Sequence, residues 1–232
     1  MKNYAFIFAR GGSKGLTRKN VKELCGKPLI VYSIECAKAC KSIDKVFVST
    51  DDDEIASVAE DSGAILIPRP SHLATDKSPE WLSWIHAVNW VEDYYGAFDR
   101  FISLPCTSPL RHPDDIDRSL EKLDSSCADI CVGVSESNRS PYFNMVEKND
   151  SDIVTIVLKN NTNTFRRQDT PIVYDITTIV YTTTPAYIKS NDGVFTGSVV
   201  AIEIPKNRSV DIDDIYDFML AEAILTKKVT NA

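Results

Sequence analysis

The stretch from Tyr4 to Gly15, YAFIFARGGSKG, decides the fold. Its first six residues form an apolar run that ends at a glycine-rich loop, which is typical of a buried parallel strand. The loop glycines allow unusual backbone dihedral angles and a close approach to a ligand. Four cations, Arg10, Lys14, Arg18 and Lys19, lie in or just after the loop. We expect a polyphosphate-binding loop here; the alternative is an ordinary strand-to-helix turn with solvated charges.

The loop matches neither of two common phosphate-binding motifs. A P-loop has four residues between its first glycine and a Gly-Lys-Ser/Thr run, and a dinucleotide fingerprint has the pattern Gly-x-Gly-x-x-Gly. Neither spacing occurs in this loop. The sequence therefore argues against a P-loop ATPase and against a Rossmann dehydrogenase.

Composition indicates one ordinary globular domain over residues 1–232, with 43% hydrophobic and 25% charged residues. A net charge of −7 argues against a nucleic-acid partner, since a phosphate backbone requires a basic surface. No apolar run is long enough for a membrane span, and no signal-peptide pattern begins the chain. We therefore expect a cytoplasmic protein that binds neither nucleic acid nor membrane.

The six cysteines form no Cys-x-x-Cys pair. Cys36 and Cys40, like Cys127 and Cys131, are spaced four apart inside apolar patterns, which predicts buried free thiols. No histidine spacing resembles a metal site, and no Gly-x-Ser-x-Gly elbow occurs. Covalent catalysis is therefore disfavoured.

Strand-like runs alternate with helical patterns as far as residue 134. Strands are expected at 4–9, 45–50, 64–68, 101–104 and 128–134, with helices in the four intervals between them. The acidic run 51–54 is expected to cap the helix that follows it. This alternation predicts an α/β fold with a doubly wound, mostly parallel sheet, in which ligands bind at the carboxyl ends of the strands.

The alternation breaks between about residues 138 and 172. Short alternating pieces lie there among Asn-, Asp- and Thr-rich turns, which predicts an inserted β excursion. Such an excursion can serve as a lid or a dimer contact; the alternative is a surface meander. Strands are expected again at 178–181 and 198–204, followed by a helix over about 215–226.

Asp211 and Asp213 follow the last expected strand. In extended backbone, side chains at i and i+2 point to the same side, so two carboxylates at this spacing can share Mg²⁺. Magnesium in proteins is commonly held by one or two carboxylates together with substrate phosphates, which complements a basic glycine loop. The alternative is that Asp213 or Asp214 is a helix N-cap and Asp211 is solvated.

Residues 8–20 resemble the signature loop of the CMP-sialic acid synthetases, the acylneuraminate cytidylyltransferases. The similarity continues in the family's order through residues 26–29, 48–51, 69–70, 73–76, 107–111 and 210–213. The resemblance thus covers nearly the whole chain. It implies a Rossmann-like α/β domain of the nucleotide-diphospho-sugar transferase type, with a small β-rich extension that exchanges across a homodimer.

The resemblance also implies an activity, in which the anomeric hydroxyl of a nonulosonic acid attacks the α-phosphate of CTP. This gives a CMP-sugar and pyrophosphate and requires Mg²⁺. By residue matching, Lys19, Asp211 and Arg10 are the expected catalytic residues, and Asp211 and Asp213 the metal pair. The nucleotide side comprises Arg10, Gly11, Ser13, Lys14, Asn20, Arg69 and Asp76, and the sugar side Arg167, Thr107, Ser108, Arg111 and Tyr174.

Two departures from the family pattern fall on the sugar side. Pro105-Cys106 stands where members commonly have Gln-Pro, and Asp175 to Thr178 stands where they have Arg-Pro-Asn-Gly. Legionaminic, pseudaminic, Kdn-like and eight-carbon ulosonic acids therefore remain candidates beside N-acetylneuraminic acid. Two further alternatives stay open: a nucleotide-binding module without catalysis, and transfer of another nucleotide to a sugar phosphate.

Overall fold

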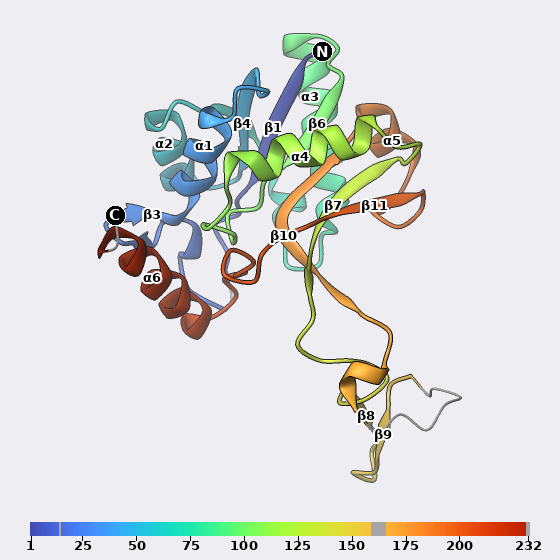
Figure 1. Cartoon of the computed structure of the whole chain (residues 1–232). Helices are drawn as coiled ribbons and strands as arrows, with labels where there is room; N and C mark the ends of the chain where they lie inside the picture. Colours follow the sequence, from blue (N-terminus) through green and yellow to red (C-terminus); the bar gives the residue numbers. More distant parts are fainter. Residues whose placement is uncertain (14, 159–165, 231–232) are drawn as a thin grey trace.

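The computed structural model describes residues 1–13, 15–158 and 166–230. Its centre is a seven-stranded sheet with the order β11-β7-β10-β6-β1-β4-β5 (Figure 1). The strands are β1 (Asn3–Phe8), β4 (Lys45–Thr50), β5 (Ile65–Pro68), β6 (Arg100–Ser103), β7 (Ile130–Glu136), β10 (Tyr174–Thr183) and β11 (Val199–Glu203). Only β10 pairs antiparallel with its neighbours in this sheet. The predicted α/β fold with a mostly parallel sheet is confirmed.

Side chains of β1 alternate between the two faces of the sheet, as a strand's period of two requires. Ala5 and Ile7 pack into one core with α1 (Leu29–Ala39), α2 (Asp53–Asp61) and α4 (Pro113–Asp124). Tyr4 and Phe6 pack on the opposite face with α3 (Glu80–Tyr95) and α5 (Pro185–Ser190). Helices thus cover both faces, which makes the fold doubly wound.

A third apolar cluster holds α6 (Ile215–Thr230) against the body of the protein. Phe218 and Ala221 of α6 pack with Leu24, Leu29 and the buried Ile212. Leu24 belongs to a small hairpin of β2 (Glu23–Leu24) and β3 (Lys27–Pro28). This cluster brings the chain's last helix next to the segment that follows the glycine-rich loop.

Between β7 and β10 the chain leaves the sheet and forms an arm, described over residues 137–158 and 166–173, which extends away from the body (Figure 1). The N–H of Ser137 donates to the carbonyl of Val173 at 3.0 Å, so the two ends of the arm lie together. The arm contains the hairpin of β8 (Val146–Lys148) and β9 (Val154–Ile156) and the turn η3 (Arg167–Asp169).

The structure corrects part of the cysteine prediction. Cys36, Cys40 and Cys131 are buried free thiols, and burial raises the pKa of each. Cys127 is exposed, because it lies in the turn between α4 and β7, before the apolar strand begins.

The predicted acidic cap is confirmed: the Asp52 carboxylate accepts from the N–H of Ile55 at 3.0 Å. In the described part of the chain, no helix has the length and apolar character that a membrane span needs.

Candidate active site

A pocket of about 570 Å³ opens where β1, β5 and β6 end. Its walls come from the loops after β1, β5 and β6, the turn η1 (Lys19–Val21), the start of α3, strand β10 and the segment before α6. Nine of the residues predicted from the sequence line it: Arg10, Ser13, Lys19, Asn20, Arg69, Asp76, Thr107, Asp211 and Asp213. The fold thus brings residues from both ends of the chain to the carboxyl edge of the sheet, where open α/β sheets bind ligands.

Two of the loop glycines, Gly11 and Gly15, lie in close contact with other parts of the chain. The glycines with positive φ in the described residues are Gly26, Gly63 and Gly96, all outside this loop. A Cβ on Gly11 would lie 2.6 Å from the carboxylate of Asp52, and a Cβ on Gly15 would collide with the carbonyl oxygen of Asp213. Gly11, Gly12 and Gly15 therefore do not have the positive φ that favours glycine, and the close approach that the structure shows is between two parts of the chain.

We expect Gly15→Ala to displace either the loop or the Asp213 segment, because a backbone carbonyl cannot move aside as a flexible side chain can. A displacement of about 1 Å in a pocket wall commonly costs on the order of 10²-fold in turnover. Steady-state kinetics should therefore show a large fall in kcat. The control is Gly193→Ala, since a Cβ there would meet nothing within 4 Å. Equal kinetics for the two variants would contradict the role given to Gly15.

The four cations of the loop do not all lie in the pocket. Arg10 lies in the pocket and forms an ion pair with Asp76 at 2.8 Å. Arg18 instead pairs with Asp52, at 2.5 Å, and with Glu54, so its charge is held at the start of α2. The interpretation of Arg18 as part of the anion-binding group is therefore corrected. Lys14 lies outside the described residues.

Lys19 connects the segment after the glycine-rich loop to the segment before α6. Its side chain is 13% exposed, its Nζ donates to the carbonyl of Ile212 at 2.5 Å, and it lies 3.5 Å from Oδ1 of Asp213. Asn20, next to it, donates to the carbonyl of Arg10 at 3.1 Å and so holds the start of the loop. The cation and the two aspartates therefore share one pocket before any ligand is considered.

Asp211 and Asp213 both line this pocket, as their spacing predicts. Asp214 accepts from the N–H groups of Tyr216 and Asp217, at 2.8 and 3.1 Å, and so takes the role of N-cap to α6. In the part of the chain described, Oδ1 of Asp211 is buried without a hydrogen-bond partner. Asp214, and neither Asp211 nor Asp213, is therefore the carboxylate that caps α6.

The site suits a magnesium ion that completes its coordination with substrate. Burial raises the pKa of Asp211 and the charge of Asp213 adds to the shift, whereas the hydroxyls of Thr107 and Thr178 and the charge of Lys19 oppose it. A divalent cation beside Asp211 would offset the cost of its buried charge. No group of three His, Cys, Asp or Glu residues that could hold a metal occurs among the described residues. One or two carboxylates plus phosphate oxygens match the preference of Mg²⁺.

Arg69 forms another wall of the pocket. Its guanidinium is nearly buried, donates to the carbonyl of Ser49 at 2.6 Å, and lies 5.6 Å from the ring centre of Phe8. Desolvation lowers the pKa of Arg69, although its ordinary value is so high that the group stays charged at neutral pH. Arg69 and Phe8 thus present a fixed cation and an aromatic ring to the same cavity.

Arg111 lies behind the pocket rather than in it. Between Thr177 and Tyr181 the pairing of β10 with β7 is interrupted by a bulge. The guanidinium of Arg111 donates to the carbonyls of Thr178 and Ile179 within this bulge, and to the carbonyl of Pro105 at 2.7 Å. The prediction that Arg111 contacts the sugar is therefore corrected: its donors satisfy carbonyls that the interrupted ladder leaves free.

Two other residues predicted for the sugar side, Ser108 and Tyr174, also lie outside the pocket lining. Ser108 is buried, and its hydroxyl lies 2.6 Å from that of Thr178, outside the pocket lining. Tyr174 lies at the start of β10, where its hydroxyl donates to Glu203 at 3.1 Å, and it does not line the pocket. The side chain of Arg167 lies outside the described residues. The predicted sugar contacts of Ser108 and Tyr174 are therefore not supported.

Two pocket residues of β10 were missed by the sequence interpretation. Thr178 and Tyr181 line the cavity from the bulge and from the residue after it. Burial raises the pKa of Tyr181 to about 12, so its hydroxyl stays protonated and able to donate at neutral pH. The sequence feature that could have pointed to this strand is the departure from the family pattern at Asp175 to Thr178, which lies on β10.

Comparisons with known proteins agree on one family. A family model described as cytidylyltransferase matches residues 4–217. A CMP-N,N'-diacetyllegionaminic acid synthase of Campylobacter jejuni is 32% identical over 224 residues, which cover 96% of this chain and 94% of that protein. An N-acylneuraminate cytidylyltransferase of Escherichia coli is 31% identical over 225 residues, which cover 97% of this chain and 52% of that protein.

A solved structure supports the same fold. A CMP:2-keto-3-deoxy-manno-octonic acid synthetase complexed with CTP superposes with a TM-score of 0.73, covering 98% of this chain and 100% of that one. Sequence identity to this structure is 15%, so the likeness concerns the fold alone.

Proposed function

This chain belongs to the cytidylyltransferase family, and on that premise we propose that it transfers CMP from CTP to the anomeric hydroxyl of a nonulosonic, sialic-acid-like sugar. The observation that carries the proposal is that Arg10, Lys19, Asp211 and Asp213 line one pocket. Cations suit a triphosphate, and a pair of carboxylates suits the metal that accompanies it.

In this reaction the anomeric oxygen forms a bond to the α-phosphorus of CTP, and the bond from that phosphorus to the bridging oxygen breaks. Pyrophosphate leaves with the bonding electrons, and the hydroxyl proton passes to a base. Phosphoryl-group transfer depends mainly on positioning and on charge stabilisation. Arg10, Lys19 and Ser13 supply donors for the phosphates, and Arg69 with Phe8 forms the nucleotide wall.

Magnesium, when bound, would neutralise charge that develops on the phosphate oxygens. Asp211 and Asp213 are the residues that would hold it. The Asp211 carboxylate, which lines the pocket and whose pKa is raised by burial, is also the group that would take the hydroxyl proton. The charge of Lys19 then balances the two carboxylates on the side of the glycine-rich loop.

The sugar is the less defined substrate. Pro105, Cys106, Thr107, Thr178 and Tyr181 form the pocket wall on the side where the sequence departs from the family pattern. Relatives act on different sugars by name, an N,N'-diacetyllegionaminic acid in one case and an N-acylneuraminate in another. Legionaminic, pseudaminic, Kdn and Kdo-type acids therefore belong beside N-acetylneuraminic acid as candidates for this chain.

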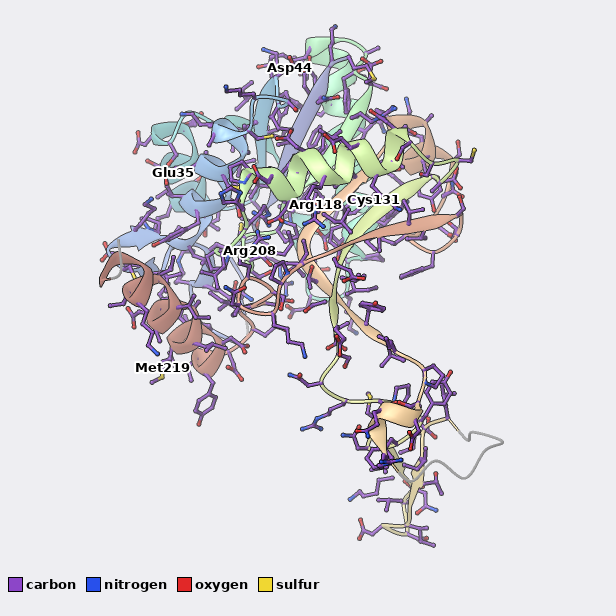
Figure 2. All side chains as sticks on the ribbon, viewed as in Figure 1. Glu35, Asp44, Arg118, Cys131, Arg208 and Met219 are labelled. Atoms are coloured by element: carbon purple, nitrogen blue, oxygen red, sulfur yellow. The ribbon has the colours of Figure 1, made fainter. Side chains whose placement is uncertain are left out.

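We also propose a cytoplasmic homodimer in which residues 1–232 act as one domain and the arm makes the dimer contact. Val146, Ile153 and Val154 are 53–62% exposed on the arm hairpin, whose side chains stand clear of the body (Figure 2). Buried free thiols fit a reducing compartment.

Sedimentation equilibrium tests the dimer. Ile153→Asp should give monomers, and a variant with the same mass in solution as the wild type would oppose an arm-mediated contact.

A pyrophosphate-release assay tests the catalytic proposal. Four nucleotides (CTP, UTP, GTP and ATP) are each combined with a panel of nonulosonic and ulosonic acids, with Mg²⁺ or with a chelator. Release should require CTP, one class of sugar and Mg²⁺. Binding of CTP by calorimetry without release for any sugar would favour a non-catalytic nucleotide-binding module. Release from another nucleotide with a sugar phosphate would favour the third alternative.

A further inference from the structure

The segment that carries Asp211 lies between β11 and α6 and is not part of any β-strand. After β11 the chain makes a turn, in which the N–H of Arg208 donates to the carbonyl of Pro205 at 2.9 Å. Downstream of Asp211 the segment is held twice, because the N–H of Ile212 donates to the carbonyl of Thr107 at 2.8 Å and Lys19 donates to the carbonyl of Ile212. The position of Asp211 therefore depends also on what holds the segment upstream.

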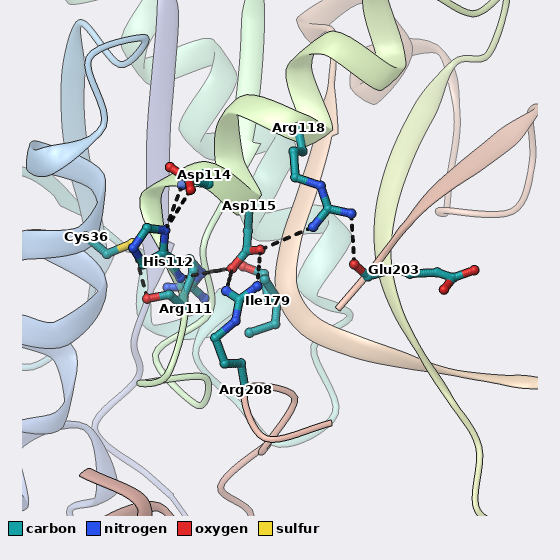
Figure 3. Close-up of polar contacts among 9 residues, drawn as sticks. All are labelled: Cys36, Arg111, His112, Asp114, Asp115, Arg118, Ile179, Glu203 and Arg208. Carbon is teal, nitrogen blue, oxygen red and sulfur yellow. Dashed lines mark hydrogen bonds and ion pairs between the residues drawn. The ribbon is translucent and has the colours of Figure 1, made fainter. Parts of the chain in front are cut away.

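Upstream, Arg208 is anchored to a buried carboxylate. Both terminal nitrogens of its guanidinium donate to the two oxygens of Asp115, the second at 2.9 Å (Figure 3). Asp115 is fully buried, and its Oδ2 also accepts from the N–H of His112 at 2.9 Å, which closes the capping box of α4. Arg118 lies 3.8 Å from the other oxygen. Arg208 is labelled beneath α4 in Figure 2, beside the segment that leads to α6.

The first turn of α4 is itself fixed to the sheet. Arg111, one residue before the N-cap His112, donates to the carbonyls of Pro105, Thr178 and Ile179. Asp115 is thus a rigid point at the carboxyl edge of the sheet. A bidentate contact fixes direction as well as distance, which a single donor does not.

Stability alone is a weak explanation for such a pair. Buried ion pairs contribute little net stability relative to well-packed apolar residues, because their desolvation is costly. What a bidentate buried pair does supply is a defined geometry. We propose that Arg208, held by Asp115, is a positioning residue that sets Asp211 and Asp213 at the reaction site. This rests on the proposed function for the identity of the reaction.

The principal variant is Arg208→Lys, which keeps the charge but loses the second donor. A second variant, Asp115→Asn with Arg208→Gln, removes both charges and leaves no unpaired buried ion. The matched control is Arg100→Lys, together with Arg100→Gln plus Asp124→Asn. In that pair, Nε and Nη2 of Arg100 contact Asp124 at 3.0 and 2.6 Å, at the opposite end of α4.

Three measurements separate positioning from simple stabilisation. We expect kcat to fall on the order of 10–10²-fold in the Arg208 variants, as for a misplaced catalytic group, while KM for CTP changes less than about threefold. The Mg²⁺ concentration for half-maximal rate should rise. Amide hydrogen exchange in a peptide covering residues 206–214 should accelerate about tenfold or more, as expected for a locally loosened segment. Arg208→Lys should retain more activity than the double variant, and the Arg100 variants should match the wild type in all three.

Folded Arg208 variants with the kcat and exchange of the Arg100 controls would overturn the proposal. A fall in thermal midpoint alone, shared with the controls, would also overturn it. The exchange measurement needs no turnover, so it decides the positioning role even where no sugar gives pyrophosphate release. Absence of pyrophosphate release with every sugar would count against the proposed function and not against the placement of the Asp211 segment.

Discussion

Lys19→Ala should lower kcat by ~10²–10³-fold, because it removes a preorganised positive charge from the phosphate side of the pocket. In free energy this corresponds to roughly 3–4 kcal/mol of lost transition-state stabilisation. The side chain also donates to the carbonyl of Ile212, so its loss frees the backbone between the two aspartates. Single-turnover measurements with saturating CTP should locate the defect in the chemical step.

The matched control is Lys22→Ala. Lys22 lies three residues further on, outside the pocket lining, with its ammonium 5.5 Å from the ring centre of Phe218 on α6. It should keep kcat within about twofold, since surface substitutions away from special features have small effects. Circular dichroism should show that both variants fold. Near-normal turnover in Lys19→Ala would refute its assigned role.

Asp211→Asn should separate activity from stability. The amide keeps the shape of the side chain but removes the charge that a metal or a proton would use, so kcat should fall ~10²–10³-fold, as for the loss of one strong electrostatic contact. Because burial raises the pKa of Asp211, its ionised form is disfavoured in the folded protein relative to the unfolded chain. At pH 7, without metal, the melting temperature of the variant should therefore equal or exceed that of the wild type.

Asp214→Ala should show the opposite pattern. This residue caps α6 through the N–H groups of Tyr216 and Asp217, and losing an N-cap costs about 0.5–2 kcal/mol. Its melting temperature should fall while kcat stays close to the wild-type value. Calorimetry and the pyrophosphate assay on the two variants check both statements. An Asp211→Asn protein that turns over normally would remove Asp211 from the mechanism.

The sequence could predict the sheet because the alternation of apolar strands and helices is a local property. The carboxyl-edge location of the pocket then follows from the parallel strands, and the spacing of Asp211 and Asp213 correctly predicts that both face one cavity. Strand β10 was predicted only as residues 178–181, since its first half is rich in polar residues. Its antiparallel direction depends on how the arm returns, which no local pattern encodes.

Local patterns also could not distinguish neighbouring cations. Arg18 and Lys19 are adjacent and equally charged, but Arg18 has φ 55° and points to the start of α2, whereas Lys19 reaches the pocket. Arg111 was misassigned for a related reason. Its true partners are carbonyls freed by a register shift between β7 and β10, and that shift involves residues about 70 positions away in the chain.

The bulge in β10 has a consequence for which position of the pocket wall tolerates a change of side chain. Thr178 stands on a stretch whose carbonyls are held by a guanidinium instead of by neighbouring strands, so changes there leave the sheet's hydrogen bonds intact. A substitution of the Thr178 side chain can therefore reshape this wall of the pocket without breaking a backbone hydrogen bond of the sheet.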